Sequence, residues 1–276
     1  MTGLDHTPIY DSALKASASI EEAREILRYR HLVIQMVRRD IVARYKRSVL
    51  GVAWTMLNPL GMMVILSIVF SQVFKTDQTF PPYILSGLIA WNFFSITTSD
   101  AMTNLIGGVA LLQRIYMPHT IFAISALGNG LFNLIISLIP LIAVMLVVGQ
   151  PIHWAFLFFP VPLLLLCCFT LGIGLLVSTI AVYFRDVVAM YQILMTAWMY
   201  LTPIMYPENV LPENLRFLLT NINPMYSLIH LFRIPIYDGR LPLWSEFWPA
   251  LVISIGTLAI GWLVFSRKSH EFAYRI

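Results

Sequence analysis

Six long apolar stretches set the first limit on what this chain can fold into. They cover residues 52–74, 82–105, 120–148, 156–183, 187–206 and 248–265. A helix of about 20 apolar residues is long enough to cross a hydrocarbon core roughly 30 Å thick. Only 12% of the 276 residues are charged, whereas soluble domains have about 25%. The sequence therefore predicts an all-α integral membrane protein with six transmembrane helices.

The lysine and arginine residues predict how these helices are oriented. Nine of the 18 lie in the first 50 residues, ahead of the first apolar stretch. With a cytoplasmic N-terminus, 14 fall on the cytoplasmic side and four on the outer side, as the positive-inside rule requires. We therefore expect a cytoplasmic segment 1–51, a six-span domain 52–265 and a cytoplasmic tail 266–276. Because the basic residues gather at one membrane face, they do not indicate nucleic-acid binding.

The segment 207–247, between the last two predicted spans, contains two apolar pieces that are too short or too interrupted to cross the membrane. We expect them to form a re-entrant hairpin at the outer side, where surrounding protein covers the backbone.

Residues 20–48 are predicted to form an amphipathic helix at the membrane interface, with Ser19 as its N-cap. Apolar residues recur every four positions on one face, and basic residues lie opposite. The apolar stripe is Val33, Val37, Ile41 and Tyr45, and the basic residues are Arg38, Arg39 and Lys46. Asp40 and Arg44 are four apart and are expected to pair. This interface helix acts either as a plain anchor or as a lever that passes force from a cytoplasmic partner into the first span.

Few polar residues lie inside the predicted spans. Asp100 is the one acidic residue well inside a span, and we expect it to be solvated or bonded to Thr97 or Asn104. Asn129 and Asn133 share a helix face and are expected to bond across helices.

Five motifs, in order along the chain, resemble ABC-2 type membrane subunits that export polysaccharides such as O-antigen, capsule and teichoic acid. The first motif comprises Arg39, Asp40, Arg44, Tyr45, Ser48, Leu50, Gly51, Trp54 and Pro59. The others are YILSGLIAWNFFS at 83–95, YFRDV at 183–187, LTPIMYP at 201–207 and NPMYSLI at 223–229. The resemblance covers the chain from Leu32 onward.

The resemblance implies a half-transporter in the bacterial cytoplasmic (inner) membrane. In this family two copies of the membrane subunit form a pore, and two copies of a separate ATPase bind ATP and magnesium. This chain has no G-x-x-x-x-G-K-[ST] motif to cradle nucleotide phosphates. We therefore expect no cofactor, metal or catalytic residue in the chain itself.

The resemblance also indicates which residues contact the ATPase. The family's coupling helix corresponds to the loop at 107–119, whose apolar patch favours docking on a protein surface over a bare turn. Its expected contact residues are Leu111, Leu112, Arg114, Ile115 and Tyr116. Arg185 and Asp186 are expected either to make a smaller second contact or to form a solvated turn in which the aspartate caps a helix.

Aromatic residues are the candidates for a translocation path, because sugars stack on aromatic rings and hydrogen-bond at their edges. The candidates are Trp91, Phe93, Phe94, Trp198, Tyr200, Tyr206 and Tyr226. Ordinary core packing is the alternative for each of them.

The function predicted from these features is the permease subunit of an ATP-driven exporter for undecaprenyl-diphosphate-linked polysaccharide. The nearest alternative is an ABC-2 exporter of a drug, lipid or other non-glycan cargo. An integral-membrane enzyme acting on a lipid-linked sugar would need acidic or histidine groups gathered at one membrane face, and the six histidines are scattered. An ion-driven transporter would need several buried acids, and Asp100 alone is available.

Overall fold

A computed structural model describes residues 18–46, 49–74, 80–108, 117–206 and 212–275 of the chain. Every regular element within these ranges is helical, as the sequence predicts. The long helices are α3 (Ala53–Phe74), α4 (Phe80–Gly107), α6 (Thr120–Val148), α7 (Pro160–Tyr183) and α11 (Trp244–Arg275). The shorter elements are α1 (Ala18–Arg28), α2 (Arg30–Tyr45), the 3₁₀ turn η2 (Trp154–Phe158), α8 (Val187–Leu201), α9 (Glu213–Ile222), α10 (Pro224–Arg233) and the π-helical turn η4 (Ile234–Asp238).

Four stretches of the described residues are long and apolar enough to cross a membrane. They are Ala53–Phe70, Thr120–Val148, Trp154–Tyr183 and Trp244–Ser269. The helix α4 is long but less apolar, because it is enclosed by protein and need not face lipid. The helix α8 is apolar but ends at Leu201 and not at the predicted Tyr206, because Pro203 holds Thr202 in an extended conformation.

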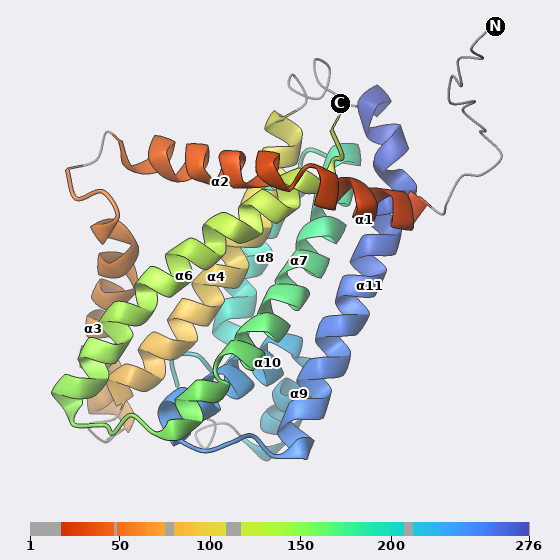
Figure 1. The fold of residues 1–276 in the computed structure, drawn as a ribbon. Helices are drawn as coiled ribbons and strands as arrows, with labels where there is room; N and C mark the ends of the chain where they lie inside the picture. Colours follow the sequence, from red (N-terminus) through yellow and green to blue (C-terminus); the bar gives the residue numbers. More distant parts are fainter. Residues whose placement is uncertain (1–17, 47–48, 75–79, 109–116, 207–211, 276) are drawn as a thin grey trace, which may run out of the picture.

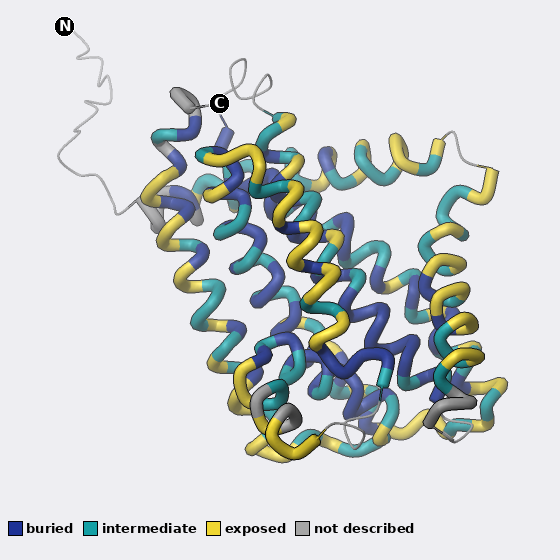
Figure 2. Tube along the Cα trace, turned by 180° about the vertical axis from the view of Figure 1, so that it is seen from behind, coloured by how far each residue is buried: buried dark blue, intermediate teal, exposed yellow. Residues whose placement is uncertain are grey.

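The centre of the bundle is α4, which packs against α3, α6, α7, α8 and α10. Residues 84–91 are buried without interruption, and Figure 2 shows this dark, buried interior behind more exposed outer helices. The helices α7 and α11 approach each other closely. A methyl group added at Gly172 would lie 2.6 Å from the backbone of Thr257, so the glycine is what permits the contact.

The two ends of the bundle differ in construction. The helices α1 and α2 lie across one end, where α11 also finishes (Figure 1). The short helices α9 and α10 lie toward the opposite end (Figure 1). They correspond to the two short apolar pieces that the sequence indicated in 207–247. Of the two, α10 is inserted deeply, with contacts to α4, α7 and α11.

The N-terminal segment differs from its prediction in two ways. The single helix expected at 20–48 is two helices, because the chain breaks at Tyr29, and Ser19 lies inside α1 and not at its cap. The apolar stripe of α2 packs against α6, where a methyl group added at Gly128 would lie 2.7 Å from Val37. The stripe therefore docks α2 on the bundle. The Ile34 side chain lies away from this contact and is 62% exposed.

Candidate functional site

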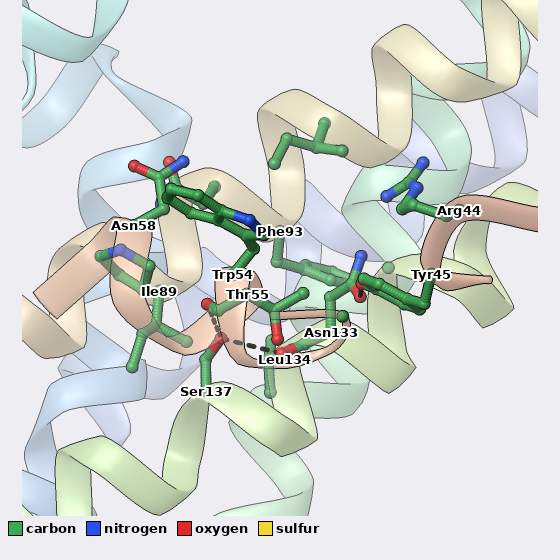
Figure 3. A pocket seen from close by; sticks show the side chains of 15 residues that line it. Arg44, Tyr45, Trp54, Thr55, Asn58, Ile89, Phe93, Asn133, Leu134 and Ser137 are labelled. Carbon is green, nitrogen blue, oxygen red and sulfur yellow. Dashed lines mark hydrogen bonds between the residues drawn. The ribbon is translucent and has the colours of Figure 1, made fainter. Parts of the chain in front are cut away.

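A pocket of about 250 Å³ opens where α2, α3, α4 and α6 meet (Figure 3). It is lined by Arg44, Tyr45, Gly51, Trp54, Thr55, Asn58, Pro59, Ile89, Asn92, Phe93, Ile96, Gly130, Asn133, Leu134 and Ser137. Five members of the first sequence motif are among them: Arg44, Tyr45, Gly51, Trp54 and Pro59. The motif therefore marks the place where the interface helix meets three long helices.

The α3 wall of this pocket is shaped by a glycine and a proline. The chain turns from α2 toward α3 at Gly51, whose φ of +47° is a conformation that favours glycine. Further along, Pro59 has no N–H to donate to the carbonyl of Thr55, four residues earlier. The Ser137 hydroxyl of α6 lies 3.2 Å from that carbonyl and shares its proton between it and the Asn133 carbonyl of its own helix, which lies at 2.8 Å (Figure 3). The Thr55 carbonyl, which the proline leaves without its helical donor, thus connects α3 to α6.

Two asparagines of α6 hold α2 against the bundle. The Tyr45 hydroxyl donates to Asn133 Oδ1 at 3.0 Å, and Asn129 Nδ2 donates to Asp40 Oδ2 at 3.2 Å. The prediction that these two asparagines bond across helices is confirmed. Burial raises the pKa of the Tyr45 phenol, so it stays protonated and remains a donor at neutral pH.

The charged residues pair differently from the prediction. Asp40 pairs with its neighbour Arg39 at 2.8 Å and not with Arg44. Arg44 instead pairs with Asp100 of α4, with 3.0 Å between Nη2 and Oδ2. We expected Asp100 to be solvated or bonded to Thr97 or Asn104. It is instead held by an arginine from another helix, with 29% of its side chain exposed. A pattern along one helix indicates only partners on that helix, whereas α4 and α6 offer partners across the interface.

The inner wall of the pocket contains polar groups that the protein does not pair. Among the described residues, the side-chain amides of Asn58 and Asn92 have no hydrogen-bond partner. The Trp54 side chain is 56% exposed, and Phe93 contributes a second aromatic ring to the lining. Because lipid cannot satisfy an amide, these groups indicate contact with water, a ligand or another chain. The described residues of the lining offer a ligand one cation, free amides and aromatic faces.

The aromatic candidates for the translocation path are divided between the interior and the surface. Trp91 and Phe94 are buried, and their ring centroids lie 6.0 and 5.5 Å from that of Trp198. Phe93 lines the pocket. Tyr200, by contrast, is 58% exposed on α8.

Polar residues lie on the same face of α8 as the exposed Tyr200. Gln192 and Thr196 are also exposed and precede Tyr200 at four-residue spacing, so the three share one face of α8. Tyr206 and Tyr226 are half-buried beyond the end of α8, where Tyr206 donates to the Tyr200 carbonyl at 3.0 Å.

The predicted contacts to an ATPase are only partly within the described residues. Leu111, Leu112, Arg114, Ile115 and Tyr116 lie outside them. Arg185 and Asp186 are exposed in the turn between α7 and α8, at the end of the bundle where α1 and α2 lie (Figure 1). Asp186 occupies the N-cap position of α8, but its side chain accepts no capping hydrogen bond. The pair is thus an exposed turn, and the capping interpretation is wrong.

Sequence reasoning missed Arg233, which the prediction treated only as an outer-side charge. Its side chain is 5% exposed and donates to the carbonyls of Tyr83, Pro203 and Ile204 at 3.2, 3.0 and 3.0 Å. The guanidinium also lies 3.7 Å from the centroid of the Tyr83 ring. A single cation inside the apolar run MYSLIHLFRIPIY was the available signal, because a buried charge needs dedicated partners.

Glu22 of α1 also makes a contact with a distant part of the chain. It is 8% exposed and accepts from the Thr120 hydroxyl at 2.8 Å. The carboxylate therefore lies at the N-terminal end of α6, where negative charge is favourable. It joins α1 to the bundle.

Comparison with known proteins gives consistent matches along the chain. Residues 31–237 match the family model described as ABC-2 type transporter. The O-antigen export system permease protein RfbA of Myxococcus xanthus is 30% identical over 93% of this chain and 100% of its own length. The permease of the same name from Klebsiella pneumoniae is 25% identical over 88% of this chain and 93% of its own. The polysialic acid transport protein KpsM of Escherichia coli is 23% identical over 83% and 90%. The region that matches the family model includes every residue that lines the pocket.

Proposed function

The chain belongs to the ABC-2 type transporter family, and we propose that it is the permease subunit of an ATP-driven exporter for O-antigen-like polysaccharide carried on undecaprenyl diphosphate. The observation that carries this function is the 30% identity over the whole length of a permease named for O-antigen export. A relative named for polysialic acid transport aligns over 83% of the chain. The permease itself makes and breaks no bond, and ATP hydrolysis takes place on a separate subunit.

The proposed assembly contains two copies of this chain and two ATPase subunits. Support comes from α3 and α8, which both pack against α4. Asn58 on α3 and Gln192 on α8 are exposed amides without a partner among the described residues. Lipid would leave both unsatisfied, whereas a polar path between two copies would accommodate them.

The proposed topology has α3, α4, α6, α7, α8 and α11 as six spans, with both termini in the cytoplasm. The common location of α1, α2 and the end of α11 supports it (Figure 1). The distribution of basic residues gives the same orientation. The hairpin of α9 and α10 is then re-entrant from the outer side.

The interface helices are proposed to act as a lever and not as a plain anchor. An anchor needs only an apolar face, but α2 is joined to α4 by Arg44–Asp100 and to α6 by Tyr45–Asn133. The exposed Arg185–Asp186 turn and the loop at 107–119 are the proposed ATPase contacts. A push at this end of the bundle would therefore reach α4 and α6 directly.

The translocation path is proposed to follow the polar face of α8. Gln192 and Thr196 would hydrogen-bond sugar hydroxyls, and the exposed Tyr200 ring would stack on sugar faces. Tyr206 and Tyr226 continue the path toward the outer end, while Trp91, Phe94 and Trp198 support α8 from inside the protomer.

Depletion of the protein in its own host tests this function. Lipid-linked glycans are extracted from intact cells, and surface glycan is measured in parallel. Loss of surface glycan with polymer trapped inside on its lipid carrier is the expected result. Normal surface glycan with no trapped intermediate would exclude polysaccharide as the cargo and leave the non-glycan alternative.

A further inference from the structure

We infer that the pocket between α2, α3, α4 and α6 binds the diphosphate and first sugar of the lipid-linked cargo, and that a phosphate takes the place of Asp100 on Arg44. This inference rests on the proposed function. It assigns a ligand class to this pocket.

The order of chemical groups in the pocket matches the order of groups in such a ligand. Arg44 is the one cation among the described residues of the lining, and it comes from the last turn of α2. The free amides of Asn58 and Asn92 and the ring of Trp54 come from α3 and α4. A guanidinium binds phosphate oxygens in a bidentate manner, whereas amides and aromatic rings suit a sugar.

The size of the pocket limits what it can hold. Its volume of about 250 Å³ is below the roughly 300–1,000 Å³ of sites for drug-sized ligands. It can enclose a sugar ring next to the diphosphate but not several sugars. The rest of the polymer would remain outside the pocket, so recognition would fall on the part that every chain length shares.

The Arg44–Asp100 pair is suited to exchange. Its two side chains are 44% and 29% exposed, and ion pairs with this much solvent contribute little to stability. A diphosphate carries more charge than one carboxylate and offers several oxygens to the guanidinium. Displacement of Asp100 would therefore cost little and gain a stronger partner.

The exchange would also change how α2 is held when cargo is present. Arg44–Asp100 is an ion pair between α2 and α4, whereas Tyr45–Asn133 and Asp40–Asn129 join α2 to α6. Loss of the first contact would free α2 from α4 while leaving it bonded to α6. Binding of the headgroup is thereby linked to the helix that we assign as the lever.

Binding to the full-length protein in nanodiscs tests this inference. The probes are undecaprenyl diphosphate, the same lipid bearing one N-acetylhexosamine, and phosphatidylglycerol. We expect Arg44→Gln to weaken binding of both diphosphate lipids by about 10- to 100-fold. The matched control Arg38→Gln removes the same charge from an exposed position on α2 and should leave binding unchanged.

Asp100→Asn separates exchange from a structural role. Removal of the competing carboxylate should tighten diphosphate binding by roughly 2- to 5-fold, whereas a merely structural pair would lose affinity when broken. If Arg44→Gln does not fold, the double variant Arg44→Gln/Asp100→Asn takes its place, because it leaves neither charge of the pair without a partner. It should show the same loss of diphosphate binding.

The sugar part of the inference has its own variant. Asn58→Ala/Asn92→Ala removes two amides that have no partner among the described residues, so it should abolish the preference for the sugar-bearing lipid and spare bare undecaprenyl diphosphate. The control Asn221→Ala removes an amide that bonds only within α9 and should change nothing.

Three results would overturn the inference: equal losses in Arg44→Gln and Arg38→Gln, weaker binding in Asp100→Asn, or phosphatidylglycerol bound as tightly as the diphosphate lipids. The last would identify the pocket as a general phospholipid site. If export by intact cells is established and these variants bind normally, the inference fails while the proposed function stands. Failure of the proposed function would instead appear as unchanged surface glycan on depletion.

Discussion

Two arginines at opposite ends of α4 show how differently one bundle can hold a positive charge. Arg44 is 44% exposed and meets a single carboxylate, that of Asp100. Arg233 is 5% exposed, and its guanidinium lies against the Tyr83 ring and three backbone carbonyls. The first arginine is beside a pocket with free amides, and the second is enclosed by protein on all sides.

The difference indicates which end is built to change partners. The carbonyls around Arg233 come from α4 and from the segment after α8, so the side chain joins α10 to both. Replacing these contacts would require several groups to move together. Arg44 needs only one partner to be exchanged. We therefore regard the Arg233 end as a fixed joint and the Arg44 end as a changeable one.

The largest expected effect is at the fixed joint. Arg233→Met removes the donors to three carbonyls and should lower the free energy of unfolding by roughly 2–4 kcal/mol. The thermal unfolding midpoint of the detergent-purified protein measures this, with the exposed Arg38→Gln as control. A midpoint equal to that of the control would show that the joint contributes nothing.

Gly87 tests the same joint without touching the charge. A methyl group added there would collide with the Arg233 guanidinium, so Gly87→Ala should cost about 1–3 kcal/mol by overpacking. Gly61→Ala is the matched control, because a methyl group at Gly61 has no atom within 4 Å. It should be neutral or stabilising by up to about 1 kcal/mol. Equal midpoints for the two variants would contradict the described contact.

At the pocket, the Ser137 hydroxyl should have a moderate effect. Ser137→Ala leaves the Thr55 carbonyl without the donor that replaces the N–H missing at Pro59, at a cost of about 1 kcal/mol. Thr196→Ala is the control, because its hydroxyl bonds only to the Gln192 carbonyl within α8. The thermal unfolding midpoints of the two variants measure this effect. If the midpoint of Ser137→Ala equals that of the wild type, α3 and α6 are held together by apolar packing alone.

The smallest effect on stability is expected at the changeable end. Arg44→Gln/Asp100→Asn removes a partly exposed pair and should alter the free energy of unfolding by no more than about 1 kcal/mol. A loss comparable to that of Arg233→Met would show that this pair is also a fixed joint, and the distinction between the two ends would be lost.

The sequence was most informative where a pattern repeats along one element. Apolar length predicted the helices, and four-residue spacing correctly grouped Asn129 with Asn133. It failed where partners come from distant parts of the chain. Asp40 and Arg44 satisfy the pairing rule within α2, but they do not pair with each other. Arg44 pairs with Asp100 of α4, and Asp40 bonds to Asn129 of α6 as well as to its neighbour Arg39.

Arg233 was overlooked for a related reason. Counting charges by segment treats an arginine between two spans as solvated, and only the inserted position of α10 reveals that it is buried. The pocket was likewise invisible in advance, since its amides lie on three helices and no local pattern connects them. The first motif nevertheless contains five of its lining residues.

The most direct measurement is made in the host cell with the Arg44→Gln/Asp100→Asn variant as the only copy of the protein, at the wild-type amount in the membrane. Surface glycan and lipid-linked glycan are measured together. Our account predicts that surface glycan falls and that polymer accumulates inside on its diphosphate carrier, although the protein is folded. Wild-type surface glycan with no accumulated intermediate would contradict the claim that the pocket is where this permease meets its cargo.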